Sequence, residues 1–138
     1  MVSITDQRGD GMQDLRKRIL SVDDSAIIRK IIRSAVEALK YELLEAADGE
    51  EAISILKKEN NIKLILLDWN MPGMNGYDFL KLAKSDSSFK NIPIMMVTTE
   101  SEKENIIMAV KAGVTNYLVK PFNTEELIKK IMQCIRED

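Results

Sequence analysis

Hydrophobic residues occur along the chain in two alternating patterns. In one pattern they form continuous runs of about four to eight residues, which is typical of strands buried on both faces. In the other they recur every three or four residues, which predicts amphipathic helices. The expected strands are residues 17–24, 41–46, 63–68, 92–99 and 115–120. The expected helices are residues 25–39, 48–60, 76–84, 101–113 and 123–138.

Capping residues support the bounds of two of these helices. Asp48 and Glu51 have the spacing of a capping box, in which each side chain accepts a hydrogen bond from the other residue's backbone N–H. Ser101 and Glu104 repeat that spacing at the start of the helix 101–113. Gly113 is expected to stop this helix, because glycine readily adopts the left-handed conformation that ends helices.

The regular alternation of strand and helix predicts an α/β fold. Successive strand–helix–strand units form parallel sheets, so we expect a single doubly wound five-stranded parallel sheet with its five helices on both faces. No linker or change of composition interrupts residues 16–138, which are therefore expected to form one domain. Residues 1–15 are polar and lack periodicity, and we interpret them as a disordered or cloning-derived lead.

Composition excludes several classes of function. The formal net charge is −2, which gives no reason to expect binding to nucleic acid or to an anionic membrane. Histidine is absent, which removes Ser-His-Asp and Cys-His catalysis and His-ligated zinc. The single cysteine, Cys134, cannot form an internal disulfide and is expected to be a packing residue. With no apolar segment typical of a membrane span or a secretory signal, we expect a cytoplasmic protein.

Polar residues gather at the carboxyl ends of four expected strands. In an open parallel sheet, ligands bind in the crevice beyond those ends. Each residue has a simpler interpretation as a helix cap, a strand residue or a solvated side chain, but four coincident strand ends favour one shared site. The residues are Asp23, Asp24, Asp68, Thr98, Thr99 and Lys120.

The residue types at these ends indicate a hard cation and an anionic substrate. Three neighbouring carboxylates raise one another's pKa unless a cation compensates them, and oxygen ligands suit Mg²⁺ or Mn²⁺. Asn70 is placed to add its carbonyl oxygen. Lys120 and the Thr98 hydroxyl can then receive an anion. A phosphoryl group fits, because an aspartate such as Asp68 can act as its nucleophile.

Four segments resemble the receiver domains of two-component response regulators in their order and spacing. They are VDDS (22–25), LDWNMPGMNG (67–76), VTTE (97–100) and YLVKPF (117–122). The resemblance extends from residue 17 to about residue 136. The segments DWNMPGMNG and SEKENIIMAVKAG most resemble the stand-alone chemotaxis regulators of the CheY type. The family implies a flavodoxin-like strand order, 2-1-3-4-5.

The resemblance implies a role for each residue at the strand ends. Asp68 would accept the phosphoryl group from a histidine of a partner kinase. Asp24, Asp68 and the backbone carbonyl of Asn70 would bind Mg²⁺, and Asp23 would hold a metal-bound water. Lys120 would contact the phosphoryl oxygens.

The same family supplies a switch and a means of tuning the lifetime of the signal. Thr98 would also contact the phosphoryl oxygens and Tyr117 would move inward as Thr98 shifts. The Lys120–Pro121 bond is expected to be cis, as in the family. Asn70 and Glu100 would tune the loss of the phosphate.

The family also implies partners and an output. We expect no second domain after the last helix, and therefore output through a surface on the fourth helix, the fifth strand and the fifth helix, in a monomer that is not a turnover enzyme. The residues expected on that surface are Ile106, Tyr117, Phe122 and Lys130. The expected partners are a chemotaxis-type histidine kinase and the flagellar motor switch protein, with a phosphatase as a further candidate.

Three other functions share part of this sequence pattern. A single-domain phosphorelay shuttle would use the same site but pass the phosphate to a histidine phosphotransfer protein. A phosphatase of the haloacid dehalogenase type needs a second Asp two residues after its nucleophile, where this chain has Asn70, which cannot donate a proton in that way. A flavodoxin-like cofactor binder needs a phosphate-binding loop after the first strand, where DDSAIIR would repel phosphate.

Overall fold

The computed structural model describes residues 16–71, 73–99 and 102–135. Within these residues strands and helices alternate along the chain, as the sequence predicts. The strands are β1 (Arg18–Val22), β2 (Glu42–Ala46), β3 (Ile62–Asp68), β4 (Ile94–Thr99) and β5 (Asn116–Lys120). The helices are α1 (Ala26–Ala38), α2 (Gly49–Lys58), α3 (Gly76–Ser85), α4 (Lys103–Lys111) and α5 (Thr124–Cys134). The interpretation of residues 1–15 lies outside the described residues.

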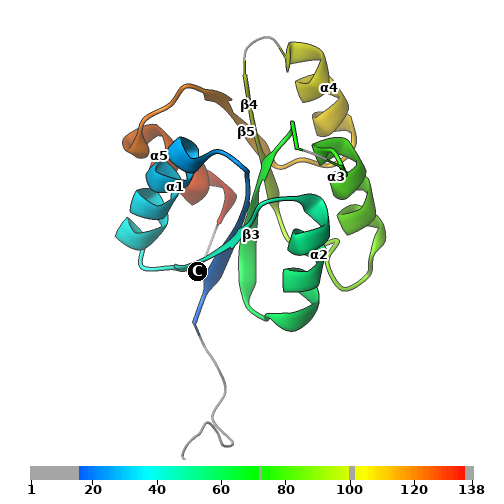
Figure 1. Cartoon of the computed structure of the whole chain (residues 1–138), viewed down its shortest axis with the longest axis horizontal. Coiled ribbons are helices and arrows are strands. Elements are labelled where there is room, and N and C mark those ends of the chain that lie inside the picture. The colour runs from blue at the N-terminus through cyan, green and yellow to red at the C-terminus, as the bar shows by residue number, and fades with distance from the viewer. Residues whose placement is uncertain (1–15, 72, 100–101, 136–138) are drawn as a thin grey trace, which may run out of the picture.

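The five strands of the described chain form one parallel sheet in the order β2-β1-β3-β4-β5. This is the doubly wound, flavodoxin-like arrangement expected from the sequence. Helices α1 and α5 cover one face of the sheet, and α2, α3 and α4 cover the other (Figure 1). The polar ends of the strands therefore meet at one edge, between the two helical layers.

Both faces of the central strand β3 are buried, which explains its continuous apolar run. Leu64 and Leu66 pack with residues of α1 and α5, whereas Ile65 and Leu67 pack with residues of α2, α3 and α4. All four side chains are at most 1% exposed. Because neighbouring strand residues point to opposite faces, a strand between two helical layers needs apolar residues at every position.

Two expected capping boxes differ from the structure. Asp48 caps α2 by accepting a hydrogen bond from the Glu51 N–H at 2.8 Å, but the Glu51 carboxylate accepts from Ala47 N–H rather than from Asp48. The backbone N–H that the Glu51 carboxylate accepts thus belongs to the residue before the N-cap, one position earlier than in a standard capping box. Ser101 lies outside the described residues, and the N-cap position of α4 is occupied by Glu102.

The ends of α4 and α5 show one prediction confirmed and one signal missed. Gly113 has a φ of +107° just after α4, as expected for a helix stop. Asn123 and Glu126 form a complete capping box at the start of α5, which is not among the predicted caps. Helix α5 ends at Cys134, whose side chain is buried as expected. None of the helices in the described ranges is long and apolar enough to cross a membrane.

Candidate functional site

Three carboxylates converge where β1 and β3 end side by side. Val22 pairs with Leu67 in the sheet, so Asp23 and Asp24 follow β1 directly beside Asp68, the last residue of β3. One carboxylate oxygen from each of the three lies within 4.8 Å of the others. Asp23 and Asp68 are 2% and 6% exposed, whereas Asp24 is exposed to solvent. The sequence predicted this cluster, although β1 ends two residues earlier than expected.

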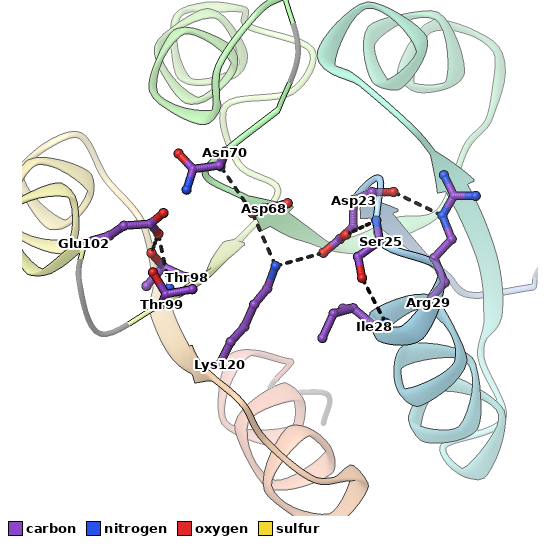
Figure 2. Close-up of polar contacts among 10 residues, drawn as sticks. All are labelled: Asp23, Ser25, Ile28, Arg29, Asp68, Asn70, Thr98, Thr99, Glu102 and Lys120. Carbon is purple, nitrogen blue, oxygen red and sulfur yellow. Dashed lines mark hydrogen bonds and ion pairs between the residues drawn. The ribbon is translucent and has the colours of Figure 1, made fainter.

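Two hydrogen bonds, one from the loop after β1 and one from helix α1, hold Asp23 in place (Figure 2). Its Oδ1 accepts a hydrogen bond from the Ser25 backbone N–H at 2.7 Å, and its backbone carbonyl accepts one from Arg29 Nε at 3.1 Å. Ser25 is itself the N-cap of α1 and accepts from Ile28 N–H. The other carboxylate oxygen of Asp23, Oδ2, is buried and has no hydrogen-bond partner among the described residues. Neither the Ser25 nor the Arg29 contact with Asp23 was predicted from the sequence.

Lys120 brings a positive charge to the carboxylates from the end of β5. Its Nζ lies 3.6 Å from both Asp23 Oδ2 and Asp68 Oδ1 (Figure 2). These distances describe ion pairs rather than hydrogen bonds. Only 19% of the Lys120 side chain is exposed. The Lys120–Pro121 bond is cis, as expected.

The surroundings of Asp68 make it a weaker acid than an ordinary aspartate. Burial, and secondarily the nearby Asp23 carboxylate, raise the pKa of Asp68 to about 6. Lys120 opposes this shift, as does the backbone N–H of Asn70, which donates to Asp68 Oδ1 at 3.2 Å. A bound cation would favour the carboxylate form. Asp68 is thus a buried carboxyl group that ionises more readily when positive charge lies beside it.

Thr98 lies at the same edge of the sheet but faces another partner. It is 1% exposed, and its hydroxyl donates to Oε2 of Glu102, the residue just before α4. The same carboxylate oxygen accepts the Thr99 backbone N–H at 3.1 Å. Figure 2 shows Glu102 reaching back over the end of β4 to these two threonines. The contact of Glu102 was not predicted from the sequence, and Glu100, for which a role was predicted, lies outside the described residues.

The expected output surface is only partly exposed. Tyr117 is 39% exposed, and Lys130 Nζ lies 5.5 Å above the centre of its ring. Ile106 is half-buried and packs against the core beneath α4. Placing Phe122 on the surface was wrong, because its ring is 7% exposed and packs in the core with α1 and α5. The turn after β5 directs this apolar ring inward.

Comparison with known proteins identifies the family. The model of the response regulator receiver domain matches residues 19–132. The chain belongs to the response regulator receiver domain family. It is 49% identical to the chemotaxis protein CheY1 of Helicobacter pylori over 115 residues, which cover 83% of this chain and 93% of the relative. It is 43% identical to the CheY homolog of Campylobacter jejuni, covering 83% of this chain and 88% of that protein.

Solved receiver structures agree with this assignment. The chemotaxis response regulator CheY4 of Vibrio cholerae superposes with a TM-score of 0.79 at 38% identity, covering 86% of this chain and 98% of that one. The receiver domain of a Pseudomonas aeruginosa sensor histidine kinase, solved with a magnesium ion in its active site cleft, gives 0.77 at 25% identity, with coverage of 87% and 98%. Membership of this family makes the chain a phosphorylation-based signalling protein rather than an enzyme with a separate substrate.

Proposed function

We propose that this receiver accepts a phosphoryl group on Asp68 and transmits the modification through the surface around Tyr117. The observation that supports this most strongly is the position of Asp68, a buried carboxylate at a strand end with the Lys120 ammonium 3.6 Å away. Residues that only stabilise a fold rarely place a carboxylate of raised pKa beside two further acids.

The residues around Asp68 fit a divalent cation such as Mg²⁺ or Mn²⁺. Asp23 Oδ2 is buried and has no hydrogen bond among the described residues, although the Lys120 ammonium lies 3.6 Å away, so a metal-bound water would supply the hydrogen bond that this oxygen lacks. The cluster offers only hard oxygen donors, which suit Mg²⁺. Asp24, Asp68 and the Asn70 carbonyl would hold the ion, with Asp23 on its water. When bound, the ion supplies positive charge to the phosphoryl oxygens.

The transfer itself is a displacement at phosphorus. One oxygen of the Asp68 carboxylate attacks the phosphoryl group of a kinase phosphohistidine, and the bond between phosphorus and the imidazole nitrogen breaks. The products are an acyl phosphate on Asp68 and a free histidine. Lys120 stabilises the added charge because its ammonium is already beside Asp68 Oδ1. The Thr98 hydroxyl is a second donor once it leaves Glu102.

The relatives favour a role in chemotaxis. The Helicobacter pylori and Campylobacter jejuni relatives are chemotaxis proteins, which supports a chemotaxis-type histidine kinase as the phosphate donor and the flagellar motor switch protein as the target. The surface that would contact the target comprises Ile106 and Tyr117 with the Lys130 ammonium stacked on the tyrosine ring. A phosphatase that removes the phosphate would act at the rim near Asn70, which is exposed.

Acetyl phosphate and intact-mass spectrometry test the acceptor. In the presence of Mg²⁺ the wild type should gain the mass of one phosphoryl group, and Asp68→Asn should gain none. Asp78→Asn, which changes an aspartate in the first turn of α3 that is not part of the acidic cluster, is the matched control and should behave as the wild type. A phosphoryl group that still appears in Asp68→Asn and maps to another residue would overturn the assignment.

A binding assay tests the proposed output. The protein treated with beryllofluoride and Mg²⁺ should bind a motor-switch peptide more tightly than the untreated protein. The competing function, a phosphorelay shuttle, would instead show rapid loss of phosphate to a histidine phosphotransfer domain and no gain in peptide binding.

A further inference from the structure

We infer that Glu102 is a positioning residue that holds the Thr98 hydroxyl in the unphosphorylated protein and so opposes the signalling state. This inference rests on the proposed function, because it concerns the hydroxyl that would otherwise contact the phosphoryl group on Asp68. Neither the acceptor Asp68 nor the Lys120 charge depends on it. It adds a residue of this chain that sets how readily phosphorylation is converted into the switched conformation.

Two hydrogen bonds join Glu102 to the end of β4. Its Oε2 accepts the Thr98 hydroxyl and, at 3.1 Å, the backbone N–H of Thr99 (Figure 2). Thr98 is 1% exposed, so water competes poorly for its hydroxyl. A hydrogen bond to an ionised carboxylate is roughly twice as strong as one between neutral groups. This hydrogen bond therefore holds the Thr98 side chain in one conformation.

The carboxylate of Glu102 does not perform the usual task of a side chain at its position. The N-cap side chains of the other four helices in the described chain accept a hydrogen bond from their own first turn; these are Ser25, Asp48, Asn75 and Asn123. Glu102 occupies the N-cap position of α4 but makes no such bond. Its oxygen is used on the preceding strand instead. Capping of α4 thus does not explain the contact.

Thr98 cannot serve Glu102 and a phosphoryl group together. A hydroxyl carries a single proton and can donate only one strong hydrogen bond. A phosphoryl group on Asp68 can therefore accept the Thr98 hydrogen bond only if the hydroxyl stops donating to the Glu102 carboxylate. A ligand shifts a two-state equilibrium only by the difference between its affinities for the two states. The hydrogen bond between Thr98 and Glu102 stabilises the unphosphorylated conformation, so it reduces the shift that a phosphoryl group can produce.

The position of Thr98 in the sheet links this competition to Tyr117. Met96 pairs with Tyr117 and Thr98 pairs with Val119 on the neighbouring strand. Because side chains alternate along a strand, Thr98 and Tyr117 point to the same face of the sheet, the face covered by α4. Release of Thr98 from Glu102 therefore changes the packing on the side where Tyr117 lies.

The affinity for beryllofluoride in the presence of Mg²⁺, measured by calorimetry, tests the role of Glu102. Glu102→Ala should bind this phosphoryl analogue about tenfold more tightly than the wild type, the effect of removing one charge-assisted hydrogen bond from the unswitched state. Glu104→Ala is the matched control. It removes the other carboxylate at the start of α4, which is exposed, and should change the affinity by less than about twofold.

Repeating the measurement in a Thr98→Val background separates the hydroxyl from simple charge repulsion. If Glu102 acts through the hydroxyl, Glu102→Ala has no further effect once Thr98→Val is present. An equal gain in both backgrounds, or an equal gain in Glu104→Ala, would show that only the negative charge matters and would overturn the inference. Glu102→Gln, which keeps a neutral acceptor, should fall between the wild type and Glu102→Ala.

A readout without phosphate separates this inference from the proposed function. In the metal-free protein, Glu102→Gln should shift the amide resonance of Thr99 and the methyl resonance of Thr98, and Glu104→Gln should not. Unchanged resonances would overturn the Glu102 contact. A wild type that fails to bind beryllofluoride, with these shifts present, would overturn the proposed function and with it the switching role of Glu102. A wild type that binds it, with no change in Glu102→Ala, would overturn that role alone.

Discussion

The Lys120 ammonium lies 3.6 Å from Asp68 Oδ1 although their strands, β5 and β3, are not neighbours in the sheet. The Lys120 side chain extends over the end of β4, which lies between them (Figure 2). A contact of this kind is possible only at the carboxyl edge, where no further strand residue fills the space. The positive charge of Lys120 lowers the pKa of Asp68.

Replacing Lys120 by methionine should raise the pKa of Asp68 above its value of about 6. The Lys120 charge lowers that pKa, while burial and Asp23 raise it, so removal of the charge leaves the raising effects unopposed. Carbon NMR of the Asp68 carboxyl group across a pH series without metal measures the shift. Lys129→Met, which removes a lysine on the exposed side of α5, is the control. An unchanged Asp68 titration in Lys120→Met would contradict the prediction.

Asp68→Asn should stabilise the metal-free protein at neutral pH. The folded-state pKa of Asp68, about 6, exceeds the ordinary value of 3.8, so the folded protein binds more protons than the unfolded chain between these values. Asp68 is then neutral in both states below about pH 4, and its destabilising effect grows as the pH rises and is complete above about pH 6. We expect a gain of about 1–2 kcal/mol at pH 7.5, less than the full pKa shift implies, because water reaches the rim of the site.

Urea unfolding in EDTA at pH 5 and pH 7.5 measures this effect. The difference between Asp68→Asn and the wild type should shrink at pH 5, where the wild-type carboxyl is mostly protonated in the folded protein. Added Mg²⁺ should stabilise the wild type more than the variant, because binding to the folded state alone raises its stability. A pH-independent difference would assign the gain to packing rather than to the charge.

Asp24→Asn should weaken Mg²⁺ binding by at least about tenfold, because loss of an outer partner alone costs a metal site that much or more. Asp24 is exposed, so the substitution should leave the fold intact. The emission of Trp69, the residue after Asp68, provides the measurement. Its ring is buried and packs on Tyr77 at 5.9 Å between ring centres, so it reports movement of the loop after β3. Equal Mg²⁺ titrations of Asp24→Asn and the wild type would remove Asp24 from the metal site.

Gly76→Ala should destabilise the fold by about 1–3 kcal/mol, the usual cost of overpacking. A Cβ atom at Gly76 would lie 2.8 Å from the Cα of Trp69 and 3.0 Å from the carbonyl oxygen of Asp68, and neither backbone atom can rotate away. The loop that follows the acceptor would have to shift. Gly49→Ala is the comparison, because the atom nearest to its Cβ is the Met74 sulfur at 2.9 Å, in a side chain that can change its rotamer, rather than a backbone atom. Urea unfolding should separate the two variants, and similar midpoints would contradict the prediction.

The order of the elements and the acidic cluster were predictable because they depend on local patterns. A run such as Leu64 to Leu67 can be buried only between two helical layers, and residues at the carboxyl ends of parallel strands must share an edge. Asp23, Asp24 and Asp68 follow from that rule without any knowledge of side-chain conformations. The same rule brought Lys120 to the edge, although β5 lies two strands away from β3.

The wrong and the missing predictions concern the directions in which side chains point, which a sequence pattern does not encode. Phe122 follows a cis proline, and whether its ring turns inward depends on how the backbone leaves β5. Glu102 resembles any charged residue at a helix start, and its contact with Thr98 depends on the path between β4 and α4. A threonine at the end of a strand followed four residues later by an acid at a helix start is the signal that could have suggested this contact.

Thr98→Ala should still accept a phosphoryl group at Asp68 but transmit it poorly to the surface around Tyr117. The acceptor, Lys120 and the carboxylates are unchanged in this variant, whereas the hydroxyl that can follow the phosphoryl group is lost. A charge-assisted hydrogen bond is worth roughly 1.5–3 kcal/mol, so the switched state should lose about tenfold or more in relative population. Amide NMR with beryllofluoride and Mg²⁺ measures this as the size of the resonance changes over residues 103–111 and 117–130.

The control is Thr99→Ala, which keeps the backbone N–H that Glu102 accepts and removes a neighbouring hydroxyl. In the wild type and in Thr99→Ala, Tyr117 should leave its exposed position beneath Lys130, and both segments should shift. In Thr98→Ala the changes should be confined to the loops that carry Asp23, Asp68 and Lys120. Full-sized changes at Tyr117 and along α4 in Thr98→Ala would mean that the signal travels by another route, because the hydroxyl is the only group the variant lacks besides a methyl.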